Sequence, residues 1–301
     1  MKNLKIYIAA LLLIITNQFA IAQVKGNGQP EMRAFDMKNI EKIVFNVTVD
    51  AEIDMSVSDE LFVSVDNNLF DHMVIKQKGN TLYIDQKDWI SPSENIKVIF
   101  GAQGLKKLKN TAWGHIRLIN VDQGAFDAQM NVGTLQMVGK LKEITVSTNS
   151  GKVDLSKLQA DKAKATINGN GRITLNANEI DYKGESFGQL IYLGSPKLNA
   201  KSTNADFNVT SYEQFQKQAS VAVEFVDVKL KNNTLRRRNI KFQGPIEKPF
   251  GYGAPIGPKA VKNETLPVGT RIYQENALGK DKLLVTITKA NAGKVVKLFK
   301  D

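Results

Sequence analysis

The chain has 301 residues, of which 42% are hydrophobic and 24% charged, a balance typical of a globular protein and not of a disordered one. It contains 22 glycines and no cysteine, so disulfides, cysteine nucleophiles and cysteine-based metal sites are excluded. The formal net charge is +11, which favours an anionic partner.

Residues 1–22 have the pattern of a secretory signal peptide. A lysine-containing start precedes a ten-residue apolar run, Ile6–Ile15, and Ala20–Ala22 has small residues at the positions that a signal peptidase reads. We therefore predict cleavage before Gln23 and export to a bacterial periplasm or cell surface, where a chain without disulfides is common. The alternative is a retained membrane anchor, for which ten residues are short.

The charge of the exported chain narrows the choice of partners. Loss of Lys2 and Lys5 lowers the formal charge from +11 to +9. Outside the cytosol, this excess points to acidic glycans or lipid head-group phosphates, and we expect no nucleic-acid partner. The densest basic run, Arg236–Arg238, is more typical of a solvated sheet edge than of an anion site. No later apolar run reaches 18 residues, so membrane contact is expected to be peripheral at most.

Residues 23–105 are predicted to form a strand-rich N-terminal cap and the first coils of a larger stack. Apolar and polar residues alternate through IVFNVTVDAEIDMSV, residues 43–57, which is the periodicity of β-strands. Further strands are expected around turns at Asp66–Asn68 and Lys78–Asn80.

Residues 106–243 contain a repeat in which glycine precedes a polar, apolar, polar, apolar run. Regular copies begin at Gly114, Gly133, Gly151 and Gly171, a looser copy begins at Gly188, and Ala205–Val209 keeps the spacing without the glycine. Successive copies start 19, 18, 20, 17 and 17 residues apart. Strand periodicity at this spacing predicts an all-β fold, a parallel β-solenoid of about ten coils, and disfavours a helical or leucine-rich solenoid.

Stacked coils place equivalent residues of successive copies side by side. The position after the glycine then puts Lys152 beside Arg172, which favours an anionic partner over a cleavage site. The position before the glycine holds Trp113 and Phe187, which either contact a sugar ring or plug a corner of the coil. Structural ladders are expected from the asparagines near the glycines, Asn131, Asn149, Asn168 and Asn170.

The C-terminal part differs in composition from the repeats. Residues 219–243 contain further strand patterns, whereas 244–264 hold four of the eight prolines and are predicted to be a linker. Residues 265–301 contain three strand-like runs. Because so short a piece rarely folds alone, we predict a small β-rich module that docks on the solenoid.

The chain resembles the putative auto-transporter adhesin, head GIN domain proteins of Bacteroidetes-type bacteria over roughly residues 24–215. The resemblance rests on the exported start, the lead-in VKGNGQPEMRAFDMKNIEKIVF, the alternating strands, the run DNNLFDHMVIKQKGNTLYI and the glycine-headed repeats. It implies a right-handed β-solenoid and an adhesin-like role, and it carries over no catalytic motif. The usual right-handedness of parallel crossovers agrees with this.

Few residues suit catalysis. The two histidines, His72 and His115, lack a neighbouring catalytic motif, so we expect neither a metal site nor a cofactor. A polysaccharide hydrolase needs two carboxylates at a defined separation, but Asp154 is the only acid among the third residues after the repeat glycines. We therefore predict a non-catalytic envelope protein that binds acidic glycan or another envelope component. The alternatives are a polysaccharide hydrolase or lyase and a purely structural envelope component.

Overall fold

The computed structural model describes residues 23–58, 60–184, 188–202, 209–219, 223–245, 248, 250–275 and 281–299; for 202, 218 and 219 it describes the backbone only. The predicted signal peptide lies outside these residues. The described residues are mostly β-strand, as the sequence predicts. Their helices are α3 (Tyr212–Ala219) and the two 3-10 helices η1 (Asn67–His72) and η2 (Lys289–Asn291).

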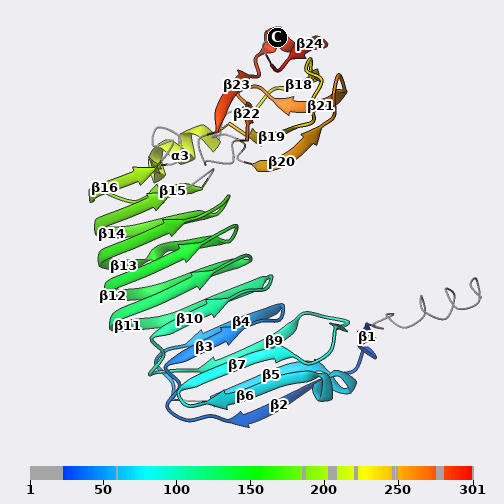
Figure 1. Cartoon of the computed structure of the whole chain (residues 1–301). Helices are drawn as coiled ribbons and strands as arrows, with labels where there is room; N and C mark the ends of the chain where they lie inside the picture. The colour runs from blue at the N-terminus through cyan, green and yellow to red at the C-terminus, as the bar shows by residue number, and fades with distance from the viewer. Residues whose placement is uncertain are drawn as a thin grey trace, which may run out of the picture.

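Four long strands form the middle of the molecule: β11 (Gly114–Met130), β12 (Thr134–Thr148), β13 (Lys152–Ile167) and β14 (Arg172–Gly184). They lie one above another (Figure 1), and each pairs with the next in parallel. A shift of register interrupts each pairing, for example between Leu118 and Val121 in β11. Such irregularities bend a strand, so each long strand has one segment before the shift and another after it.

The two sets of segments make two outward faces. Segments before the shift continue with β4 (Val49–Asp54), β9 (Ile96–Gly101), β15 (Gln189–Tyr192) and β17 (Val209–Ser211). Segments after the shift continue with β10 (Lys107–Asn110), β3 (Lys42–Phe45) and β16 (Lys197–Ser202). We call the outward side chains of the first set the front face and those of the second set the rear face.

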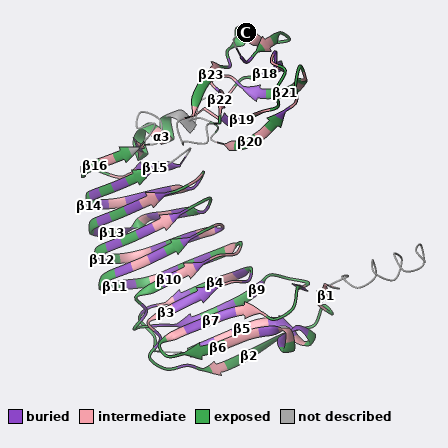
Figure 2. Cartoon of the chain, in the orientation of Figure 1, coloured by how far each residue is buried: buried purple, intermediate pink, exposed green. Residues whose placement is uncertain are grey.

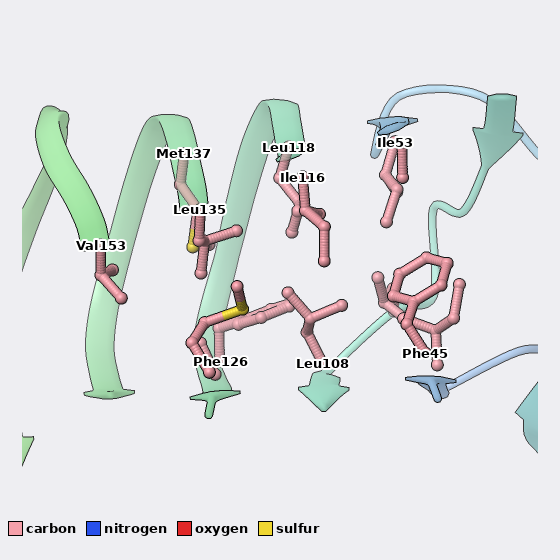
Figure 3. Close-up of a cluster of buried hydrophobic side chains, with 14 of the residues drawn as sticks. Phe45, Ile53, Leu108, Ile116, Leu118, Phe126, Leu135, Met137 and Val153 are labelled. Carbon is pink, nitrogen blue, oxygen red and sulfur yellow. The ribbon is translucent and has the colours of Figure 1, made fainter. Parts of the chain in front are cut away.

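The main core fills the space between the two faces. Buried and exposed residues alternate along the long strands (Figure 2). Inward side chains of both sets meet in Figure 3, where Phe45, Ile53, Leu108, Ile116, Leu118, Phe126, Leu135, Met137 and Val153 are labelled. A single strand cannot enclose such a core, so each strand depends on its neighbours for burial of its apolar residues.

The N-terminal part makes the large sheet a mixed one. β2 (Pro30–Asp36) and β5 (Glu60–Asp66) pair antiparallel, and β5 continues antiparallel to β9. β6 (Met73–Lys78) and β7 (Thr81–Gln86) form a hairpin, and β7 joins β3 in parallel. Outside this sheet, β1 (Val24–Lys25) pairs in parallel with β8 (Ile90–Ser91).

A second apolar core lies at the C-terminal end. Its three-stranded sheet contains β18 (Phe225–Lys231), β21 (Val261–Pro267) and β24 (Val295–Lys297). Its four-stranded sheet contains β19 (Arg238–Gln243), β20 (Gly251–Ile256), β22 (Arg271–Gln274) and β23 (Lys282–Thr286). Their inward residues, among them Leu230, Ile240 and Phe242, form a cluster of their own.

The boundaries of this unit differ from those expected from the sequence. The expected linker, 244–264, contains β20 and part of β21, and these strands pair with β19 and β18, which the sequence places with the repeats. β20 is an edge strand, a position that tolerates its Pro255. Proline and glycine therefore mark an edge here and not a linker.

The glycines that head the repeats are required for two different reasons. Gly114 has φ of 144°, and a Cβ there would collide with the carbonyl oxygen of Val49 in the neighbouring strand. Gly171 has no positive φ, but its Cβ would lie 2.6 Å from Cγ2 of Thr148. Gly114 is therefore required for its backbone conformation and its close contact, whereas Gly171 provides space.

Gly114→Ala is expected to destabilise the protein by at least about 2 kcal/mol, because the added methyl group meets backbone that cannot move without breaking the β4–β11 pairing. Gly124→Ala is the matched control, since a Cβ there has no atom within 4 Å. Urea unfolding of both variants measures the difference. Equal midpoints for the two would contradict the close approach of β4 and β11.

A buried carboxylate attaches the N-terminal segment to the cap. Asp66 is 2% exposed, and it accepts hydrogen bonds from the Gly28 N–H at 2.7 Å, the Ser93 N–H at 2.8 Å and the Ser93 hydroxyl at 2.6 Å. Burial by itself would raise the pKa of Asp66, but these hydrogen bonds together hold it below its ordinary value. The ionised form is therefore the one that stabilises this junction.

Asp66→Ala is expected to lower the free energy of unfolding by about 2–3 kcal/mol at neutral pH, because it removes three hydrogen bonds to a charged carboxylate. Because the folded-state pKa is depressed, the contribution is complete above about pH 4, the ordinary pKa of aspartate, and is lost as the pH falls further. Urea unfolding at pH 7 and pH 3 should show a smaller gap between wild type and variant at pH 3. The exposed Asp36→Ala is the control and should show almost no gap at either pH.

Candidate binding face

The parallel pairing arranges front-face side chains in rows that cross the strands. One row consists of Lys97, Asp50, His115, Thr134, Lys152 and Arg172. A second row, two residues further along each strand, consists of Ile99, Glu52, Arg117, Gln136 and Asp154. Neighbouring strands are about 4.8 Å apart, so each row offers regularly spaced contacts to a long ligand that lies across the strands.

A groove of about 610 Å³ opens on the front face over β9, β4, β11 and β12. Its polar lining is held by hydrogen bonds within the face. Arg117 Nη1 lies 3.2 Å from Glu52 Oε2, and His115 Nδ1 lies 2.7 Å from the Thr134 hydroxyl. The groove therefore combines both charges and neutral hydrogen-bonding groups, a composition that suits a ligand rich in hydroxyl groups.

One carboxylate oxygen in the groove has no partner in the described part of the chain. Asp50 Oδ2 accepts a hydrogen bond of 2.9 Å from the Asn95 amide, whereas Asp50 Oδ1 is buried and accepts none from any described residue. Buried polar atoms are normally satisfied. The described residues therefore leave the hydrogen bonding of Asp50 incomplete.

Lys152 and Arg172 adjoin the groove. They face each other in the β13–β14 pairing, as the repeat alignment predicts, and Lys152 follows Thr134 in the same row. No ion pair joins a described acid to either side chain. Lys152 is exposed, so its ammonium group is accessible to a ligand.

Arg172 is held in place by the helix that follows the repeats. Its guanidinium carbon lies 5.0 Å from the centre of the Phe215 ring in α3. Burial lowers the pKa of Arg172 from its ordinary value, but a guanidinium group remains charged at neutral pH. Lys152 and Arg172 thus form a pair of adjacent cations. The Lys152 ammonium group is exposed, whereas the Arg172 guanidinium group packs against Phe215.

The rear face also carries lysines, but there acids alternate with them. Lys162 lies between Glu143 and Glu179 in the strand pairing. Two lysines do face each other at Lys183 and Lys201, with Asp181 two residues before Lys183 in the neighbouring row. Asp154 is related to Lys152 in the same way, so each face has one pair of adjacent cations with one acid in the neighbouring row.

The structure places the other predicted residues in different environments. Trp113 is 66% exposed at the corner before β11, so it is not a buried plug, and Phe187 lies outside the described residues. His72 Nδ1 lies 2.7 Å from Asp88 Oδ2 in an exposed pair. Within the described ranges, no cluster of three or more histidine or acidic residues is placed to hold a metal ion.

The expected hydrogen bonding between asparagines of successive repeats occurs between Asn168 and Asn149, but Asn170 bonds to a different partner. The Asn168 amide lies 3.4 Å from Asn149 Oδ1 in the preceding corner. Asn170 instead donates a hydrogen bond of 3.0 Å to the carbonyl oxygen of Gly251 in β20. That bond connects a repeat corner to the C-terminal unit.

Sequence reasoning missed the groove. Asp50 and Glu52 belong to β4, which is not headed by glycine and pairs with β11 some 65 residues later. The available signal was the alternation of acids with apolar residues in 49–54, which indicates an outward polar side but not its neighbours.

The strand pairing and the front face together describe an all-β protein whose repeat strands stack on one another. The chain belongs to the family described as putative auto-transporter adhesin, head GIN domain, whose model matches residues 39–196, slightly more than half of the chain. The resemblance predicted from the sequence is thereby confirmed.

One of the similar solved structures, the first named below, supports the fold. A putative adhesin from Bacteroides fragilis is 18% identical, with a TM-score of 0.51, over 62% of this chain and 98% of its own. A putative adhesin from Parabacteroides distasonis is 16% identical, with a TM-score of 0.49, over 63% of this chain and 99% of its own. No curated protein matches the chain. In the part of the chain that is described, no helix has the length and apolarity to cross a membrane.

Proposed function

We propose that this chain is a non-catalytic, adhesin-like protein of the bacterial cell envelope that binds acidic glycans across its front face. The observation that carries the proposal is the adjacency of Lys152 and Arg172, with no ion pair to a described acid. An acidic glycan presents carboxylate or sulfate groups at regular intervals. A guanidinium group binds such anions through two parallel hydrogen bonds, and an ammonium group adds a point charge.

The scaffold that we infer for this face is a right-handed parallel β-solenoid. The parallel pairing of β10 to β14 supports it, as does the right-handedness of nearly all parallel crossovers. A stack of this kind fixes the spacing of the front-face side chains before a ligand arrives. Binding to such a surface loses little conformational entropy in the protein.

The proposed location is the periplasm or the cell surface. It is supported by the signal-peptide pattern of residues 1–22 and by membership of an adhesin-like family. In either place, acidic polysaccharides and lipopolysaccharide are the abundant polyanions, and a net positive chain is attracted to them.

A polysaccharide hydrolase or lyase is the alternative function, and one observation favours it. Asp50 and Glu52 both line the groove from the same side of β4. Paired carboxylates across a sugar chain are the requirement for glycoside hydrolysis. A purely structural envelope component, with no soluble ligand, is the remaining possibility.

The double variant Lys152→Ala/Arg172→Ala is expected to bind a galacturonic acid hexamer about tenfold more weakly than wild-type 23–301, because two favourable charge contacts are lost. Calorimetric titration at low and high ionic strength measures this, and salt should weaken wild-type binding. Lys183→Ala/Lys201→Ala removes the same charge from the rear face and is the matched control. Equal loss in both variants would mean attraction by net charge alone.

The same samples distinguish the alternatives. Release of reducing ends from polygalacturonate by the wild type, but not by Asp50→Asn, would replace the binding proposal with hydrolysis. Absence of binding at either ionic strength would leave the structural role.

A further inference from the structure

A second pocket lies around the corner from the groove, on the edge between the two faces. It has a volume of about 260 Å³, the size of a single sugar ring, and its lining includes Trp89, Asn46, Gln86, Glu94 and Asn95. The Trp89 side chain is 57% exposed. An exposed indole offers a large apolar face on which a ligand ring can pack.

The amide groups of this pocket are held in fixed orientations. The Asn46 amide donates to Asp85 Oδ2 at 2.9 Å, and its oxygen accepts from the Thr111 hydroxyl at 2.9 Å. The Asn95 amide donates to Asp50 Oδ2 at 2.9 Å. Each amide keeps further hydrogen-bonding capacity after these contacts, and amides can both donate to and accept from neighbouring hydroxyl groups.

The backbone of Trp89 is anchored by the N-terminal segment. Its carbonyl oxygen accepts a hydrogen bond of 2.9 Å from the Val24 N–H, next to the β1–β8 pairing. Asp66 holds the adjacent loop through Ser93. The main chain that carries the indole is therefore held by hydrogen bonds. A ligand that stacks on the indole needs no rearrangement of this main chain.

The charge of the pocket points to a neutral ligand. Glu94 is the one ionisable side chain in its lining, and Lys97 of the groove lies 3.2 Å from it. Among the described residues, no cation lines the pocket to bind an acidic group. The Glu94–Lys97 pair and the Asn95–Asp50 hydrogen bond form a wall shared by the pocket and the groove.

We propose that this corner pocket binds a neutral pyranose ring, which stacks on Trp89 and exchanges hydrogen bonds with the surrounding amides. The inference rests on the proposed function, because it assigns a second subsite to the same glycan-binding surface. A glycan chain that enters the pocket reaches the groove across the shared wall and continues along the row to Lys152 and Arg172. The surface would thus select glycans that contain both neutral and acidic sugars.

The test uses three neutral probes, cellohexaose, maltohexaose and xylohexaose, beside the galacturonic acid hexamer. Trp89 and Trp113 are the two tryptophans of the chain, so Trp113→Phe leaves Trp89 as the single indole reporter. We expect at least one neutral probe to change the fluorescence of wild type and of Trp113→Phe. Trp89→Ala should weaken binding of that probe about tenfold, and Trp89→Phe should retain part of it because an aromatic face remains.

The readouts separate this inference from the proposed function. Lys183→Ala/Lys201→Ala, on the rear face, should leave neutral-probe binding unchanged, whereas Lys152→Ala/Arg172→Ala is scored with the acidic hexamer alone. If none of the neutral probes binds, or if one binds equally well to Trp89→Ala, the pocket assignment is wrong, whatever the acidic hexamer does. Thermal unfolding checks that Trp89→Ala remains folded, as expected for an exposed side chain.

Discussion

The hydrogen bonding between successive parallel strands is the constraint on which the other features depend. Because β11 to β14 pair residue by residue on both sides of the register shifts, inward apolar side chains there stack on their equivalents and outward side chains form rows. Strands that approach this closely leave no room at Gly114 for a side chain. The core, the glycine positions and the front face are therefore three consequences of one pairing pattern.

The same pairing explains why the candidate contacts collect on one face. Lys152 and Arg172 come from the adjacent strands β13 and β14, and the groove beside them combines β9 and β4 of the cap with β11 and β12 of the repeats. On the rear face, in-register acids lie on both sides of Lys162. Charge is thus distributed differently on two faces that share one backbone scaffold.

The sequence predicts most accurately where the repeat is regular. A constant distance from each glycine correctly placed Lys152 opposite Arg172, since both residues follow the glycine directly. Asp50 and Trp89 lie in segments without the repeat, and their positions depend on pairings across long separations that no local pattern reveals. In the C-terminal unit, Pro255 suggested a linker because local composition does not distinguish an edge strand from an irregular segment.

The most direct test of the glycan-binding face is a crystal structure of residues 23–301 in complex with a galacturonic acid oligomer. We expect the oligomer to cross the strands on the front face, with a carboxylate beside Lys152 and Arg172 and hydroxyl groups toward Asp50 in the groove. An oligomer that runs parallel to the strands, or that occupies the rear face at Lys183 and Lys201, would contradict this assignment.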